Sequence, residues 1–168
     1  LASADSGAEQ TFTDISSLQD SSNPYDPFAL HKAALIACGV IPYKEPVSVQ
    51  EITKNLGSGL YLSTQVINIP RGLGTSSILA GVCVKALYEM LGKEVTDEEL
   101  YDRVLCMEQI MSTGGGWQDQ VGGLTDGIKL VTTRPGLMQN IEVQHLQIPE
   151  EALQELKDRF VLIYTGQR

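Results

Sequence analysis

Apolar residues recur at helical spacing in two stretches of the chain, and each stretch predicts an amphipathic helix. The first opens at Asp26 and Pro27, where a carboxylate can cap the helix and a proline suits its first turn, and it stops at Gly39. The second covers residues 75–91 and stops at Gly92. Its apolar positions at helical spacing are Ile78, Leu79, Val82, Ala86 and Met90.

Further elements follow from capping and strand patterns. Residues 96–99, Thr-Asp-Glu-Glu, form a capping-box pattern that opens a third helix to about Ser112. Residues 60–69 are rich in β-branched and aromatic side chains and predict a strand that Pro70 ends. After a glycine-rich stretch at 114–127, the remaining expected elements are a strand at 128–133, a short helix at 153–159 and a strand at 160–164. Because helices and strands mix without strict alternation, we expect an α+β fold.

The chain is expected to hold one main domain. Residues 1–23 are rich in Ser, Asp and Gln without a sustained period, which indicates a poorly ordered lead-in or a detached strand. Residues 24–168 form the predicted domain, and the length of 168 residues fits a single core. The chain ends at Arg168, four residues after the last predicted strand, which indicates a piece of a larger protein.

Composition narrows the classes of partner. The formal net charge of −9 disfavours a general binder of nucleic acid or of anionic membranes, but it allows a small phosphorylated ligand held by a few local groups. No apolar run approaches the roughly 20 residues of a membrane span, and no signal pattern is present. Three widely spaced cysteines, Cys38, Cys83 and Cys106, predict reduced thiols in a cytoplasmic protein.

Residues 70–77, Pro-Arg-Gly-Leu-Gly-Thr-Ser-Ser, join a predicted strand to a predicted helix and resemble a phosphate cradle. Glycines let backbone N–H groups approach an anion, and the helix start adds free N–H groups and a positive dipole end. The alternative is a glycine turn with a Thr or Ser helix cap. The segment has neither the Gly-Lys-Ser/Thr of a P-loop nor the spacing of a dinucleotide fingerprint.

Two carboxylates come next along the chain. Glu108 lies on a mostly apolar helical face, where a buried charge needs a cationic partner such as Mg²⁺ carried by a nucleotide. The alternative is an edge glutamate that reaches solvent or pairs with an arginine. Asp119 is the one carboxylate in Gly114–Gly123 and could accept or orient a hydroxyl proton. The alternative for that segment is a flexible surface loop anchored by Trp117.

The order of these motifs resembles the GHMP small-molecule kinases, over roughly residues 12–166. Within that superfamily, GGGWQDQVGG at 114–123 and DPFALHKAA at 26–34 are most similar to the L-fucokinase branch. The resemblance implies the N-terminal half of the family fold, a ribosomal S5 domain 2-like sheet packed with helices, in incomplete form. It also implies ATP-dependent phosphorylation of the anomeric hydroxyl of L-fucose to fucose 1-phosphate, on the salvage route to GDP-fucose.

The resemblance also implies residue roles. Asp119 would be the catalytic base or orienting group, and Mg²⁺ would be bound by Ser77 and Glu108. The triphosphate of ATP would be held by Gly72, Leu73, Gly74, Thr75, Ser76 and Ser77. The sugar and phosphate side of the site would be shaped by Gly114, Gly115, Gly116 and Trp117.

The chain also departs from the family pattern. No sugar-binding motif is found in residues 1–25, and the family's third motif would lie beyond Arg168. We therefore expect the segment alone to be inactive and to depend on flanking kinase segments. Two alternatives stay open: a heptose or other sugar kinase, and a non-catalytic nucleotide-binding fragment of the same fold. The sequence leaves open the sugar specificity, the oligomeric state and the presence of a pyrophosphorylase domain upstream.

Overall fold

The structure is a computed structural model that describes residues 1–23, 25–69, 74–114, 116–136 and 140–163. The chain divides into two compact units, Leu1–Leu124 and Thr125–Arg168. This boundary falls inside the glycine-rich stretch, whereas we expected one domain over residues 24–168. Among the described residues, no helix has both the length and the apolar character to cross a bilayer.

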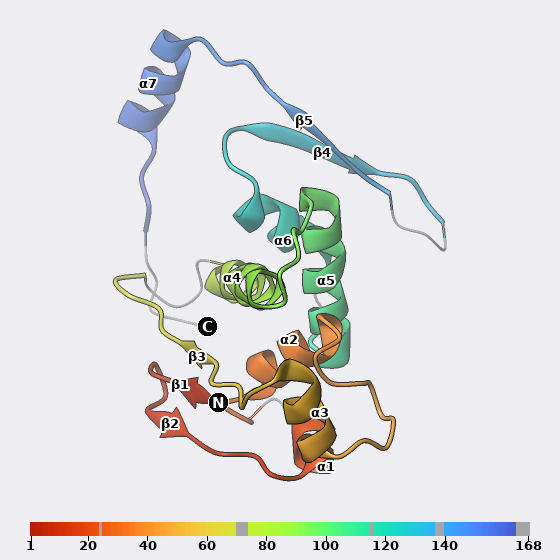
Figure 1. Ribbon diagram of the computed structural model, residues 1–168. Coiled ribbons are helices and arrows are strands. Elements are labelled where there is room, and N and C mark those ends of the chain that lie inside the picture. The colour runs from red at the N-terminus through yellow and green to blue at the C-terminus, as the bar shows by residue number, and fades with distance from the viewer. Residues whose placement is uncertain (24, 70–73, 115, 137–139, 164–168) are drawn as a thin grey trace. The chain divides into compact units, whose positions relative to one another are not determined.

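The first unit combines a small sheet with six helices among its described residues (Figure 1). Its strands are β1 (Ala2–Ser3), β2 (Ala8–Glu9) and β3 (Ser63–Thr64), with β1 central, antiparallel to β2 and parallel to β3. Its helices are α1 (Ile15–Gln19), α2 (Ala29–Ala37), α3 (Val49–Leu56), α4 (Thr75–Met90), α5 (Asp97–Ile110) and α6 (Trp117–Leu124). This mixture is the predicted α+β class. The S5-like arrangement of the sheet stays a prediction.

The leading segment is tied into the first unit. The Ala2 N–H donates to the Leu62 carbonyl at 2.9 Å, and Leu18 of α1 is buried. Asp14 caps α1 through the N–H groups of Ser16 and Ser17, and hydrogen bonds from both serines lower the pKa of its carboxyl. We expected a poorly ordered lead-in or a detached strand here. Two-residue strands and a five-residue helix are too short to leave a periodic pattern in the sequence.

The core lies where α2, α4 and α5 pack against one another. Every residue of α2 from His31 to Ala37 is buried, as expected of a helix enclosed on all sides. Asp26 accepts from the Phe28 N–H at 2.8 Å, but α2 begins at Ala29 with Phe28 as its N-cap residue, so the predicted cap by Asp26 with Pro27 in the first turn is wrong. The core is formed by apolar side chains, most of them small or branched: Ala33, Ala34, Val84, Leu87, Leu100, Val104 and Met107.

The α4 helix has the predicted extent, but its buried face is not the one that the apolar spacing indicated. Val82 is 57 % exposed, and Ile78 and Met90 are also exposed. The buried face is formed by Ala80, Gly81, Cys83, Val84 and Leu87. Because α4 carries apolar residues around much of its circumference, the pattern could establish the helix without establishing which side packs on α2 and α5.

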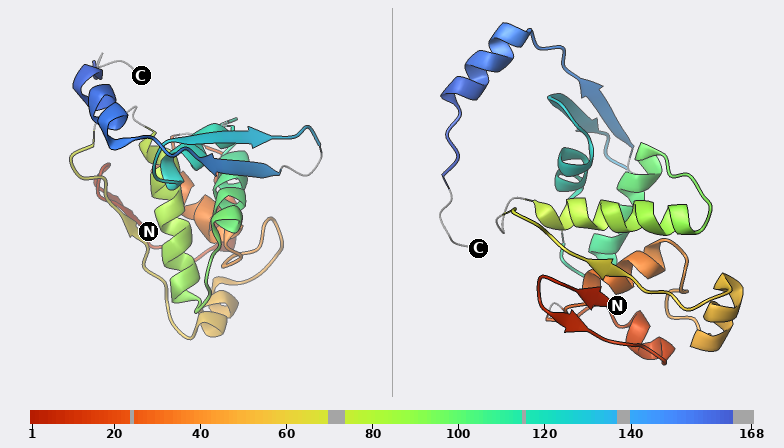
Figure 2. Two further views of the ribbon diagram at one scale, coloured as in Figure 1. Left: turned by 90° about the horizontal axis from the view of Figure 1, so that it is seen from above. Right: turned by 60° about the vertical axis from the view of Figure 1, so that its left-hand side comes forward.

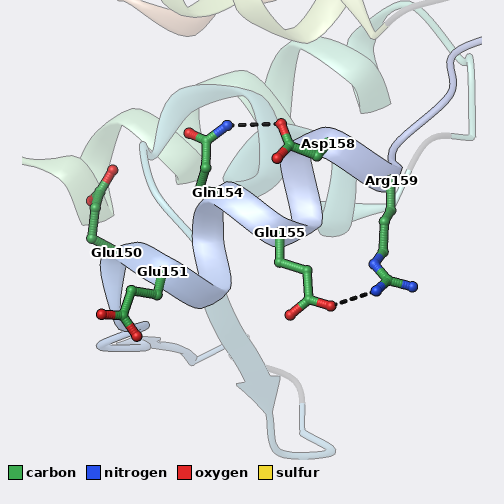
Figure 3. A pocket seen from close by; sticks show the side chains of 6 residues that line it. All are labelled: Glu150, Glu151, Gln154, Glu155, Asp158 and Arg159. Atoms are coloured by element: carbon green, nitrogen blue, oxygen red, sulfur yellow. Dashed lines mark hydrogen bonds and ion pairs between the residues drawn. The ribbon is translucent and has the colours of Figure 1, made fainter.

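The second unit holds the hairpin of β4 (Lys129–Thr133) and β5 (Ile141–His145), and the helix α7 (Glu150–Arg159). The strand at β4 and the helix near α7 agree with the sequence prediction. The strand β5 was not predicted, and the expected final strand is absent over described residues 160–163. On the polar surface of α7, Glu155 and Arg159 form an ion pair of 2.7 Å, and Gln154 donates a hydrogen bond to Asp158 (Figure 3).

Candidate functional site

The helix α4 begins at the predicted place. Gly74 is its N-cap residue in a left-handed conformation, with φ of 70°, which a residue with a side chain rarely adopts. Among the described residues no side chain caps this end, and the N-cap position is held by Gly74 and not by a Thr or Ser. As in every α-helix, the first N–H groups of α4 have no intrahelical acceptor. Ser77 is 2 % exposed in the first turn, whereas Ser76 is exposed and Thr75 is half-buried.

The predicted residues Gly72 and Leu73, with Pro70 and Arg71, lie outside the described residues, and so does Gly115. The phosphate cradle is thus described only from Gly74 onward. The segment 74–77 supplies a helix start without a described side-chain cap, together with a buried hydroxyl. Such a start favours an anion, because its N–H groups and its dipole both present positive charge.

Glu108 is buried in the last two turns of α5, where it is 8 % exposed. The hydroxyl of Thr113 donates to its Oε2 atom, and no described lysine or arginine forms an ion pair with it. Arg103, on the same helix, is occupied by Glu99, by the Tyr88 hydroxyl and by the Ala37 carbonyl. Glu108 therefore does not reach freely into solvent, and among the described residues it does not pair with an arginine; these were the two ordinary alternatives.

The glycine-rich stretch is partly helical, although we weighed it as a flexible loop. The helix α6 runs from Trp117 to Leu124, and Asp119 is exposed in its first turn. Gly114 and Gly116 precede this helix, and Trp117 is half-buried. Val121, fully buried, anchors the helix in the first unit. Packing of this apolar side chain outweighs the low helix propensity of Gly122 and Gly123.

The helices α4, α5 and α6 each contact the other two, and α6 and α2 lie on opposite sides of α4 (Figures 1 and 2). Glycines permit the approach of α6 to α4. A Cβ atom at Gly123 would lie 2.9 Å from Cγ1 of Ile78, and one at Gly81 would collide with the Leu124 side chain. Gly123, in the glycine pair that ends the GGGWQDQVGG motif, thus has a packing role. It lets α6 approach the side chain of Ile78 on α4.

This packing places Ser77, Glu108 and Asp119 on three helices that touch one another. Sequence reasoning missed two polar residues on or beside these helices. Gln120 is 1 % exposed, and its Oε1 atom has no described hydrogen-bond donor. Thr113 holds Glu108 from beyond the end of α5. Both residues lie within or beside the motif, and their contacts depend on tertiary packing that no spacing rule reports.

The segment 26–34, which carried part of the family resemblance, has a structural role. Lys32 is 5 % exposed, and its Nζ atom lies 2.6 Å from Oδ2 of Asp26 and 3.1 Å from the Asp20 carbonyl. Nζ also lies 4.9 Å from the centre of the Phe12 ring. His31 bonds the Thr64 hydroxyl at 2.9 Å. These contacts fix the leading segment and β3 against α2.

An apolar pocket of about 360 Å³ lies elsewhere in the first unit, among α1, α2 and α3. Its lining includes Phe12, Leu35, Ile52 and Leu60, and it includes none of the predicted site residues. The predicted site residues that the structure describes therefore lie outside this pocket.

Comparisons with known proteins point to one family. Residues 45–127 match the family model described as the GHMP kinases N terminal domain. The chain is 39 % identical over 165 residues to a bifunctional fucokinase/GDP-fucose pyrophosphorylase of Arabidopsis thaliana, covering 97 % of this chain and 15 % of that protein. It is 39 % identical over 171 residues to an L-fucokinase/L-fucose-1-P guanylyltransferase of Bacteroides fragilis, covering 99 % of this chain and 18 % of that protein.

The chain thus spans less than a fifth of the length of these curated relatives. The matched range contains α4, α5 and α6, with Ser77, Glu108 and Asp119 on them. The family match and the two relatives agree, and through residues 45–127 the chain belongs to the GHMP kinases.

Proposed function

We propose that this chain supplies the nucleotide- and metal-binding part of an ATP-dependent kinase that phosphorylates the anomeric hydroxyl of L-fucose. The product would be fucose 1-phosphate, which serves the salvage of fucose toward GDP-fucose. The observation that carries the proposal is the mutual packing of α4, α5 and α6, because these three helices carry a buried hydroxyl, a buried carboxylate without a described cation and an exposed carboxylate. The names of the two relatives support the choice of sugar.

The phosphates of ATP would lie at the start of α4. The free N–H groups of the first turn favour negative charge, and the hydroxyls of Thr75, Ser76 and Ser77 can donate further hydrogen bonds. Gly72, Leu73 and Gly74 would complete this cradle with backbone groups. Phosphoryl transfer needs such positioning and electrostatic stabilisation more than covalent help from the protein.

Mg²⁺ would be bound by Ser77 and Glu108 together with phosphate oxygens. The described residues contain no group of three or more His, Cys, Asp or Glu side chains that could hold a metal ion. Two protein oxygens, from Ser77 and Glu108, suit Mg²⁺, because this ion commonly keeps several waters and takes one or two protein oxygens plus substrate phosphates. The ion would neutralise charge on the phosphates during transfer.

Asp119 would accept or orient the proton of the sugar hydroxyl. Its position in the first turn of α6 leaves the carboxylate exposed and able to reach a substrate. The loop before it, with Gly114, Gly115, Gly116 and Trp117, would shape the sugar side of the site.

We also propose a cytoplasmic location for the protein, because Cys38, Cys83 and Cys106 are free thiols. Burial raises the pKa of the Cys83 thiol to about 11, which keeps this side chain in its protonated form.

The test replaces Asp119 in the protein expressed from its complete reading frame. Asp119→Asn is expected to lower turnover of L-fucose by about 10²-fold, the low end of the range for a positioned base, with ATP affinity unchanged. Asp102→Asn is the matched control, because Asp102 is an exposed carboxylate on α5 outside the proposed site. Turnover of Asp119→Asn equal to that of the control would remove Asp119 from the mechanism.

A further inference from the structure

The carboxyl end of α5 turns back on itself through a specific hydrogen-bond pattern. The Ser112 N–H donates to the Gln109 carbonyl at 3.1 Å, and the Thr113 N–H donates to the Glu108 carbonyl at 3.2 Å. Ser112 is left-handed, with φ of 56°, at the position where helices of this ending usually have glycine. This pair of bonds is a Schellman motif, and it fixes the backbone of Thr113 next to Glu108.

The side chain of Thr113 makes a contact that the helix ending does not require. The two backbone bonds already close the helix, yet the Thr113 hydroxyl also reaches the Glu108 carbonyl at 3.2 Å and donates to the Glu108 Oε2 atom. A hydroxyl has one proton, and a charged carboxylate is a stronger acceptor than a carbonyl. The bond to Oε2 is therefore the contact that Thr113 adds.

This bond restrains the carboxylate of the buried Glu108 side chain. Glu108 has no described cationic partner, and only one of its carboxylate oxygens, Oε2, has a described hydrogen-bond donor. Ordering a glutamate side chain costs conformational entropy. A ligand whose rotamer is fixed before the ion arrives avoids that loss on binding.

We propose that Thr113 is a positioning residue for the Glu108 carboxylate, holding Oε2 and leaving Oε1 to bind the divalent cation of a metal–nucleotide complex. This inference rests on the proposed function, because it takes Glu108 as a metal ligand. It assigns to the Ser112-Thr113 turn a role beyond helix termination: the left-handed serine brings the threonine to the carboxylate.

The test measures metal binding directly and does not depend on turnover. The protein expressed from its complete reading frame is titrated with Mn²⁺ in the presence of ATP, and free Mn²⁺ is followed by electron paramagnetic resonance. Mn²⁺ prefers the same oxygen ligands as Mg²⁺. Thr113→Val keeps the shape and removes the hydroxyl, and it should weaken Mn²⁺ binding about tenfold, the low end of the range for partners of metal ligands. Thr113→Ser, which keeps the hydroxyl, should bind within about twofold of the wild type.

Two further variants separate the possible explanations. Thr96→Ala removes the cap at the other end of α5, where the Thr96 hydroxyl accepts from the Glu99 N–H at 3.2 Å, so it weakens the helix without touching Glu108. Equal weakening of Mn²⁺ binding by Thr96→Ala and Thr113→Val would reduce Thr113 to a helix cap and overturn the proposal. Thr113→Ala gives a second measurement if the valine variant does not fold.

Glu108→Gln distinguishes this inference from the function on which it rests. Loss of Mn²⁺ affinity in Glu108→Gln, with wild-type affinity in Thr113→Val, would overturn the role of Thr113 and leave the proposed metal site intact. Unchanged Mn²⁺ affinity in Glu108→Gln would overturn the metal site itself. Loss in both, with recovery in Thr113→Ser, is the expected result.

Discussion

Replacing Lys32 with methionine should destabilise the first unit strongly, because it removes the cation from a buried ion pair. The side chains of Lys32 and Asp26 are 7 % and 14 % exposed, and the Lys32 ammonium also holds the Asp20 carbonyl and lies over Phe12. Methionine keeps most of the apolar volume of lysine. The variant therefore leaves the Asp26 carboxylate in a desolvated place without its partner.

The magnitude follows from what remains around Asp26. Removing one partner of a buried pair commonly costs about 3–5 kcal/mol. Asp26 still accepts from the Phe28 N–H at 2.8 Å, which compensates part of the loss. We expect a loss of about 3 kcal/mol in the free energy of unfolding. The double variant Lys32→Met/Asp26→Asn leaves no unpaired charge and should recover about 1–2 kcal/mol of that loss.

The assay is urea unfolding of the 168-residue chain followed by tryptophan fluorescence. Trp117 is the single tryptophan and belongs to α6, so its signal reports the unit that contains Lys32. Lys44→Met is the matched control: Lys44 also lies 4.9 Å from an aromatic ring, that of Tyr43, but it is exposed. The control should change stability by less than about 1 kcal/mol. Equal midpoints for Lys32→Met and Lys44→Met would refute the buried-pair argument.

Two further predictions concern pH and the isolated segment. Burial lowers the pKa of His31 from 6.5, so the unfolded chain binds a proton at His31 more tightly than the folded chain does. The contribution of His31 to stability is therefore full above pH 6.5 and should fall on acidification by at most about 1.4 kcal/mol per pH unit. In His31→Gln the urea midpoint should lose this pH dependence, and an identical pH slope in the variant and the wild type would contradict the prediction. The 168 residues alone should not phosphorylate L-fucose with ATP and Mg²⁺, because acceptor and γ-phosphate must be held in line; a rate comparable to that of the protein from the complete reading frame would contradict this.

The sequence could predict elements whose ends are marked by local chemistry. The Thr96 side chain caps α5 through the Glu99 N–H, as the capping-box pattern indicated, and α4 starts directly after Gly74. Caps and turn glycines act over a few residues, so they can be recognised in the sequence alone. The packed face of α4 could not be predicted, since the exposed Ile78 and Val82 are as apolar as the buried Val84 and Leu87.

For the candidate site too, some features could be predicted from the sequence and others could not. The roles expected of Ser77, Glu108 and Asp119 came from motif resemblance, and the structure adds that their helices are in contact. The importance of Gly123 for the approach of α6 to Ile78, and of Thr113 for Glu108, depends on three-dimensional contacts. Composition also misled at α6: glycines suggested a loop, but burial of Val121 and close packing on α4 stabilise a helix there.

The most direct test of the proposed kinase is to identify the phosphorylated product. The protein expressed from its complete reading frame is incubated with ATP, Mg²⁺ and an equimolar mixture of L-fucose, galactose, mannose and a heptose, and the products are assigned by ³¹P–¹H correlated nuclear magnetic resonance. We predict one main product, L-fucose carrying phosphate on its anomeric oxygen, and its absence in Asp119→Asn. Phosphate on another sugar or another hydroxyl, or no transfer from ATP at all, would contradict the account.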